Sequence, residues 1–109
     1  MGSKTFAVGA YVERKVAGWP FGRLDIDDDV ITVRCAPIPW FSPHRVSRDA
    51  ITEISIYKNL VLDHLKFEDS GGVFAKVSLD LPVRPRRIIR ELQSRGYPIV
   101  DHRRKSILP

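Results

Sequence analysis

The sequence predicts a mainly-β protein of the α+β class, with six or seven short antiparallel strands followed by one amphipathic α-helix. Runs of β-branched and alternating apolar residues recur from residue 21 to residue 79, and turns rich in Asp, Gly or Pro separate them. After Pro82 the apolar spacing changes from two residues to the spacing typical of a helix. The 109 residues, 43% of them hydrophobic and 28% charged, suit one globular domain. We therefore expect an antiparallel sandwich or partial barrel whose open end or edge the helix covers.

A β-hairpin is the clearest element in the first third of the chain. Residues 21–26 alternate apolar and polar side chains, and residues 30–35 are mostly β-branched. The three aspartates of residues 27–29 are typical of the turn between them. Residues 1–17 contain strand-like side chains interrupted by Gly9, and they predict an edge strand or a loosely ordered N-terminal arm.

Three further strands, and a short fourth one at residues 44–47, are expected between the hairpin and the helix. Residues 36–43 hold three prolines, so this segment cannot be an interior strand and is expected to form a loop. The three longer strands are expected at residues 51–57, 60–68 and 73–79, and a glycine-containing turn joins the last two.

The helix is predicted at residues 84–95. Proline suits its first turn, Gly96 suits its C-terminal end, and Pro98 follows. Glu91 is spaced to pair with Arg87 and Arg95 on the helix surface. Residues 101–109 are expected to form a basic tail. The apolar stripe of the helix consists of Ile88, Ile89 and Leu92.

The formal net charge of +5 is unevenly distributed along the chain. Residues 1–83 hold ten basic and eleven acidic residues, whereas residues 84–109 hold eight basic and two acidic ones, a net charge of +6. Two interpretations stay open: a solvated helix face with a soluble tail, or a patch that attracts anionic partners through salt-sensitive electrostatics. The candidate anion-binding residues are Arg84, Arg86, Arg87, Arg90, Arg103, Arg104 and Lys105.

Three aromatic residues, Trp19, Trp40 and Phe41, lie beside prolines in predicted loops. They are either plugs of the core or, if they are exposed together, an interaction patch. Few aromatic side chains accompany the basic C-terminal segment, so sequence-specific recognition of nucleic acid is not expected.

Three parts of the sequence resemble the small bacterial pleckstrin-homology-like (PH-like) domains: residues 18–24, residues 40–51, and residues 81–89 together with residues 95–99. The resemblance covers residues 18–100. It implies a seven-stranded partial barrel of two antiparallel sheets, capped by a C-terminal helix. It also implies a scaffold that binds lipids, peptides or other proteins, although a fold alone does not fix which.

The acidic turn at residues 25–29 departs from the PH domains that bind phosphoinositides, which carry Lys and Arg at this loop. Carboxylates here would repel a phosphate, so we do not expect phosphoinositide binding at this pocket. The alternate aspartates also match the start of a calcium loop, but Val30 and Ala36 stand where that loop needs Gly and Glu. An exposed hairpin turn is therefore expected.

No metal, cofactor or catalytic site is expected. The three histidines, His44, His64 and His102, are far apart in the sequence, and their spacing to Cys35 is not that of a zinc site. Cys35 ends a β-branched run, which favours a partly buried structural thiol over a nucleophile. Neither a nucleophile-elbow pattern nor a glycine-rich phosphate loop occurs.

These observations predict a cytoplasmic, non-enzymatic binding or adaptor module. The sequence has no apolar run near the ~18 residues of a membrane span, residues 1–16 lack the core of a signal peptide, and a single cysteine suits a reducing compartment. The leading hypothesis is protein–protein contact or self-association, through a groove or a strand edge. The alternative is non-specific electrostatic attachment to an anionic membrane surface or nucleic acid through the basic helix and tail.

Overall fold

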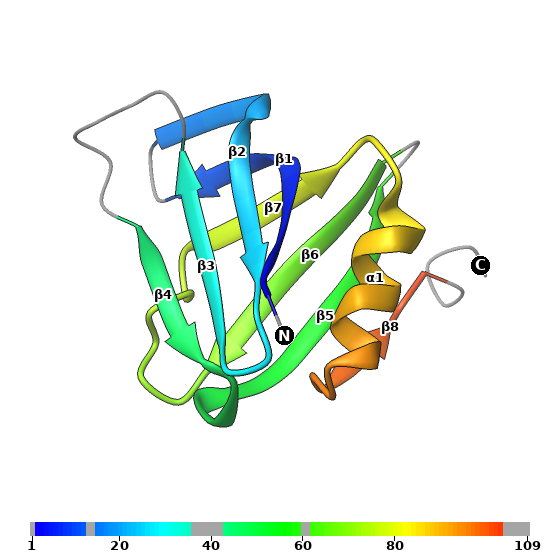
Figure 1. Ribbon diagram of the computed structural model, residues 1–109. Coiled ribbons are helices and arrows are strands. Elements are labelled where there is room, and N and C mark those ends of the chain that lie inside the picture. The colour runs from blue at the N-terminus through cyan, green and yellow to red at the C-terminus, as the bar shows by residue number, and fades with distance from the viewer. Residues whose placement is uncertain (1, 13–14, 36–42, 60–61, 104–109) are drawn as a thin grey trace.

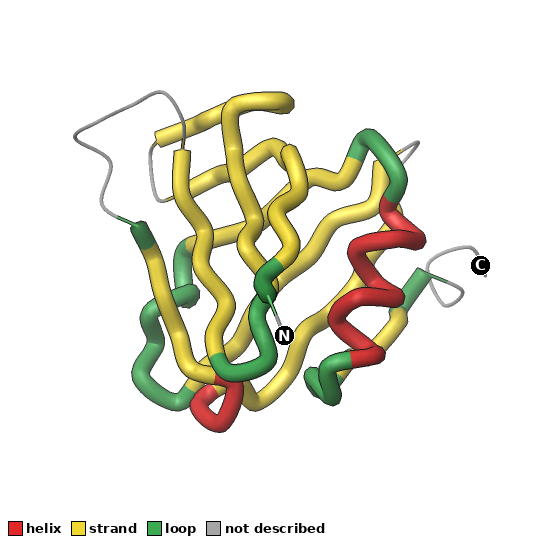
Figure 2. The backbone as a smooth tube through the Cα atoms, in the orientation of Figure 1, coloured by secondary structure: helices red, strands yellow, loops and turns green. Residues whose placement is uncertain are grey.

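The computed structural model describes residues 2–12, 15–35, 43–59 and 62–103, and its path is drawn in Figures 1 and 2. Eight strands, one short 3₁₀-helix and one α-helix follow one another along these residues. They are β1 (Lys4–Val12), β2 (Lys15–Ile26), β3 (Val30–Cys35), β4 (His44–Ser47), η1 (Arg48–Ala50), β5 (Ile51–Asn59), β6 (Leu62–Asp69), β7 (Val77–Leu81), α1 (Pro85–Ser94) and β8 (Ile99–Asp101).

The strands form one curled sheet, a half-barrel, in the order β4-β3-β2-β1-β7-β6-β5-β8 (Figure 1). The expected mainly-β partial barrel with one helix is confirmed. The count of six or seven strands is wrong, because the described part of the chain holds eight, and the expected two antiparallel sheets are corrected to one continuous sheet with a parallel pair at one edge. The additional strand is β8, which pairs in parallel with β5 through Ile54, Ser55 and Ile56. Its three residues are too few to show a period in the sequence.

β1 lies inside the sheet rather than at its edge. It pairs with β2 on both sides of Gly9, from Lys4 to Val8 and from Ala10 to Val12, and its last four residues pair with β7 on the opposite edge. The strand therefore joins the two halves of the barrel, and the expected N-terminal arm or edge strand is corrected to an interior strand. Gly9, which interrupts the pattern, lies in a tight place, since a Cβ at this position would be 3.3 Å from the Cβ of Asp80.

A wide bend interrupts β2 where it crosses β1. Ala17 and Gly22 are the residues of β2 that pair on either side of this bend, so residues 18–21 lie opposite a single residue of β1, Gly9. Gly22 permits the close crossing, because a Cβ there would lie 2.6 Å from the carbonyl oxygen of Val8. The bend leaves Trp19 about half exposed.

The strand expected at residues 73–79 is shorter and lies later in the chain than predicted. The Asp69 carboxylate accepts hydrogen bonds from the backbone N–H groups of Val73 and Phe74, at 2.8 Å each, and holds residues 70–76 in turns. Phe74 is thereby inserted into the core, fully buried and packed at a tilt against Phe67. The strand itself, β7, begins only at Val77.

Helix α1 confirms the prediction for residues 84–95. Its apolar stripe is buried in the core: Ile88, Ile89 and Leu92 are at most 7% exposed. Gly96, at φ +81°, ends the helix, with its N–H bonded to the Gln93 carbonyl and the Tyr97 N–H bonded to the Leu92 carbonyl. This pair of bonds is the Schellman motif, which satisfies the last helical carbonyls.

The C-terminal end of α1 is fastened to the acidic turn between β2 and β3. The Arg95 guanidinium forms ion pairs with Glu91 (2.7 Å) and Asp28 (3.2 Å), and it donates to the Gly2 carbonyl at 2.9 Å. The hydroxyl of Tyr97 donates to the Asp27 carbonyl at 2.6 Å. The acidic turn therefore serves to dock the helix. No helix within the described residues is long and apolar enough to cross a membrane.

Candidate functional site

Four exposed arginines lie at the start of α1 and on its exposed face. Arg84, Arg86, Arg87 and Arg90 are all exposed, and no ion pair or side-chain hydrogen bond joins any of them to another described residue. The sequence predicts that Glu91 pairs with both Arg87 and Arg95, but its described ion pair is with Arg95 alone. The charge of these four arginines is therefore available to a partner.

Arg103, the next candidate residue, is used by the fold. Its guanidinium pairs with Asp101 at 2.7 Å and with the buried carboxylate of Asp63 at 3.0 Å. The hydrogen bonds that Arg103 donates to Asp101 and to Asp63 raise its pKa above the ordinary arginine value despite some burial. Arg103 therefore stabilises β8 against β6. The remaining candidates of this group, Arg104 and Lys105, lie outside the described residues.

A cleft of about 400 Å³ lies between β1, the bend of β2 and the start of α1. It brings together residues that sequence reasoning considered apart, namely the exposed Trp19 and the basic residues Arg84 and Arg87. Arg84 is the residue before the helix and has a left-handed backbone, at φ 52°. We call this space the cationic cleft, and its lining residues are Lys4, Thr5, Phe6, Ala7, Trp19, Val83, Arg84 and Arg87.

The lining of the cationic cleft has two kinds of side chain. Three of the residues are cations, and none of the described lining residues is acidic. The others include a half-buried Phe6, a Trp19 that is 49% exposed and a Val83 that is 43% exposed. A ligand that covers such partly exposed apolar side chains removes their unfavourable contact with water. The cleft can therefore hold a group that is both anionic and apolar.

Lys4 and Phe6 are functional candidates that sequence reasoning missed. Both come from β1, whose place inside the sheet was not predicted. An alternating signal was present, since Phe6 and Val8 share one strand face, but Gly9 and Ala10 end the run before it becomes distinctive.

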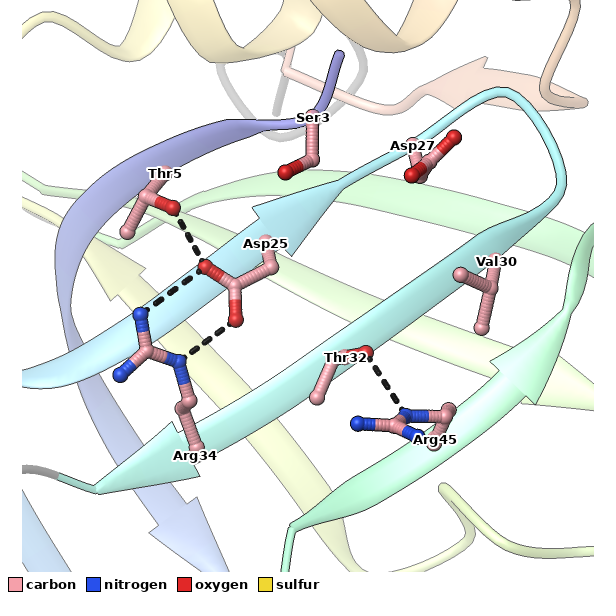
Figure 3. A pocket seen from close by; sticks show the side chains of 8 residues that line it. All are labelled: Ser3, Thr5, Asp25, Asp27, Val30, Thr32, Arg34 and Arg45. Atoms are coloured by element: carbon pink, nitrogen blue, oxygen red, sulfur yellow. Dashed lines mark hydrogen bonds and ion pairs between the residues drawn. The ribbon is translucent and has the colours of Figure 1, made fainter.

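A second pocket, of about 360 Å³, lies on the outer face of β1 to β4 and is shown in Figure 3. One ion pair lies within it: Asp25 accepts from Arg34 at 2.6 Å, and it also accepts from the Thr5 hydroxyl at 2.6 Å. Arg45 donates to the Thr32 hydroxyl at 3.3 Å, as Figure 3 also shows. We call this space the hairpin groove, and it is lined by Ser3, Thr5, Asp25, Asp27, Val30, Thr32, Arg34 and Arg45.

The hairpin groove is a weaker candidate than the cationic cleft, because its two aspartates balance its two arginines. Burial opposes ionisation of Asp25, but the hydrogen bonds from Arg34 and Thr5 outweigh it and lower the pKa of this carboxyl. A ligand would have to break these bonds in order to use the same groups. The groove therefore stabilises the sheet more readily than it binds a charged partner.

A polar cluster on β1, β6 and β7 was also not foreseen. The Asp80 carboxylate accepts a hydrogen bond from the Tyr11 hydroxyl, and its Oδ1 lies 2.5 Å from Nδ1 of His64. The hydrogen bond with Asp80 raises the pKa of Tyr11, which makes its hydroxyl harder to deprotonate and so a poorer nucleophile. We therefore infer that Tyr11 and His64 serve to pair the nearly buried Asp80 carboxylate within the sheet.

The other residues considered for chemistry are placed as follows. Cys35 is buried at the end of β3, and burial raises the pKa of its thiol, which suits a structural cysteine. No three side chains of His, Cys, Asp or Glu are grouped for a metal ion in the part of the chain that the structure describes. The candidate aromatics Trp40 and Phe41 lie outside that part, so only Trp19 of the three is placed.

Comparison with known proteins does not assign a family. A scan against models of protein families finds no match, and no curated protein matches the chain. The function is therefore inferred from the geometry of the site.

Proposed function

We propose that the protein is a non-enzymatic binding module with a PH-like fold, which takes an acidic segment of a partner protein at the cationic cleft and the adjoining face of α1. The observation that carries the proposal is the set of four exposed arginines without described acidic partners, two of which line a cleft beside Trp19. The PH-like part is supported by the strand order, in which β1 is shared by both halves of the barrel, and by the single helix after β7.

An acidic protein segment suits the cleft better than a flat charged surface does. The cationic side chains surround a concave space, into which an individual side chain of a partner can enter. Arginine, which supplies two of the three cations, offers a planar fork of donors that fits a carboxylate. An acidic segment in extended form brings such carboxylates together with neighbouring side chains for the apolar part of the lining.

Self-association through a strand edge, which the sequence left open, is less favoured by the geometry. The two edge strands are β4, with four residues, and β8, with three. Short edges offer few backbone groups to a second chain. We therefore place the contact with a partner at the side chains of α1 and the cleft.

The test compares a short fluorescent glutamate-rich peptide, its glutamine counterpart, vesicles containing phosphatidylserine, and a DNA duplex. We expect the glutamate peptide to bind and to weaken steeply between about 50 and 200 mM salt, because exposed charges are screened over about 10 Å. We expect no binding of the glutamine peptide. Binding to vesicles or DNA without binding to the glutamate peptide would overturn the proposal in favour of electrostatic attachment.

A matched pair of double variants separates a defined site from net charge. Arg84→Gln with Arg87→Gln removes two cations of the cleft, whereas Lys58→Gln with Lys76→Gln removes two exposed cations elsewhere. We expect the first pair to lower the affinity for the glutamate peptide by about 10-fold or more and the second by about 2-fold, since charge-assisted hydrogen bonds are lost only in the first. If both double variants lose affinity equally, the peptide responds to the net charge of the protein and not to a defined site.

A further inference from the structure

We infer that the cationic cleft recognises two groups of its partner at once: a large aromatic side chain, seated against Trp19, and an adjacent carboxylate, held by Arg84 and Arg87. This inference rests on the proposed function and specifies the partner of the same site. It predicts a preference for acidic segments that contain an aromatic residue over segments that are only acidic.

The apolar part of the lining is the first argument. Trp19, Val83 and Phe6 meet in one space although they belong to three separate segments of the chain. Trp19 remains 49% exposed and Val83 43% exposed, so both lining residues keep apolar surface in contact with water. A purely acidic ligand would leave this area in contact with water, whereas an aromatic side chain would cover it and stack on the indole.

The electrostatics of the lining give the second argument. Lys4, Arg84 and Arg87 gather at the cleft without an acidic residue among the described lining residues, so no carboxylate of the lining balances their charge. The pattern differs from the hairpin groove, where every arginine has a partner within the pocket. A carboxylate beside the apolar side chain of the ligand would supply the missing charge.

The size of the cleft gives the third argument. Its volume of about 400 Å³ falls at the small end of the range for pockets that enclose a compact group. It offers room for a large side chain and its neighbour but not for a whole helix. The remaining exposed cations of α1, Arg86 and Arg90, lie outside the lining and are left to attract the acidic segment from a distance.

The experiment uses four peptides of one length, combining either Glu or Gln flanks with either Trp or Ala at the centre. On the unaltered protein we expect the Glu peptide with Trp to bind about 5- to 10-fold more tightly than the Glu peptide with Ala, which is the range of one aromatic contact. This comparison needs no protein variant, so it decides the question even if a variant fails to fold.

Two pairs of protein variants then locate the two parts of the site. Trp19→Ala is matched by Phe21→Ala, an exposed aromatic of the same bend that does not line the cleft, and Arg87→Gln is matched by Arg90→Gln on the same helix. We expect Trp19→Ala to remove the advantage of the Trp peptide and to leave the Ala peptide within about 2-fold, while Phe21→Ala changes neither. Arg87→Gln should weaken both Glu peptides by about 5-fold, and Arg90→Gln by about 2-fold or less.

The outcomes separate this inference from the function on which it rests. If both Glu peptides bind equally well, or if Trp19→Ala weakens both by the same factor, the inference is wrong and the acidic-segment function stands. If neither Glu peptide binds at any salt concentration, the proposed function itself fails. A thermal unfolding curve for each variant confirms that the folded state is being compared.

Discussion

The link between α1 and the β2–β3 turn yields the most quantitative prediction about stability. The perturbation is Arg95→Met, which keeps much of the apolar stem of the side chain and removes the guanidinium. The Arg95 side chain is only 8% exposed, and the substitution removes its two ion pairs and its hydrogen bond to the Gly2 carbonyl. Glu91 then remains as a mostly buried carboxylate without its partner.

The magnitude follows from the exposure of each partner. Losing one member of a buried ion pair costs about 3–5 kcal/mol, but Asp28 is 49% exposed and its pair with Arg95 contributes little. We therefore expect a loss of about 2–3 kcal/mol in the free energy of unfolding. For a domain of this length, that corresponds to a fall in Tm of roughly 8–20 °C.

The assay is urea unfolding followed by far-UV circular dichroism, with Arg90→Met as the control. Arg90 lies on the same helix, is exposed and has no described ion pair, so its replacement should cost less than about 0.5 kcal/mol. The slope of the unfolding curve should stay constant in both variants, since the buried area is unchanged. Equal stability of the two variants would refute the assignment of Arg95 as the fastener of the helix to the acidic turn.

Three further predictions follow from individual contacts. Burial raises the pKa of Tyr97 to about 12, so the folded state holds this proton more tightly than the unfolded chain, and the resulting stabilisation should be complete below pH 10 and lost, by roughly 2–3 kcal/mol, as the pH rises past 12. Urea unfolding at alkaline pH should show this fall in the unaltered protein and not in Tyr97→Phe. Burial opposes ionisation of Asp25, but the hydrogen bonds from Arg34 outweigh it and lower the pKa of this carboxyl, so its contribution to the free energy of unfolding should be present above pH 4 and fade in acid. The Tm of Asp25→Asn should therefore fall less steeply with falling pH than the Tm of the unaltered protein. Gly22→Ala should cost about 1–3 kcal/mol by thermal unfolding, because the new Cβ would lie 2.6 Å from the Val8 carbonyl oxygen, and an unchanged Tm would show that the crossing of β1 and β2 can widen freely.

The elements that the sequence predicted best are those whose signals are local. The helix was predicted because its apolar stripe and its glycine stop lie within one short segment, and the structure begins it at Pro85 and ends it at Ser94. The hairpin of β2 and β3 likewise depends on one acidic turn and two alternating runs. Neither element required knowledge of a distant part of the chain.

The elements that were missed depend on distant parts of the chain. β1 is a strand of the interior because β2 and β7 lie on either side of it, and β8 exists because β5 offers it an edge. Gly9 weakened the strand signal, and the structure gives the reason: the backbone of Trp19 and the side chain of Asp80 approach it. Tertiary contacts of this kind leave no period in the sequence.

The candidate site was predictable in its charge but not in its shape. The concentration of arginines at the start of α1 was visible, and Trp19 was noticed separately as an aromatic residue beside a proline. Their meeting in one cleft, with Lys4 and Phe6, depends on the interior position of β1 and on the bend of β2. A sequence pattern lists residue types, whereas the register of strands decides which of them share a pocket.

Fewer positive charges in the described part of the basic C-terminal segment are therefore free to attract a partner than the sequence count suggests. Arg95 and Arg103 belong to the basic C-terminal segment, yet both are paired with carboxylates that hold α1 and β8 in place. The acidic turn of the hairpin is likewise engaged by the helix through Asp28. What remains in the described part of this segment is the group of four exposed arginines at and just before α1, two of which line the cationic cleft. Because exposed charges act over about one Debye length, the salt-sensitive part of any binding should follow these four residues rather than the net charge of the protein.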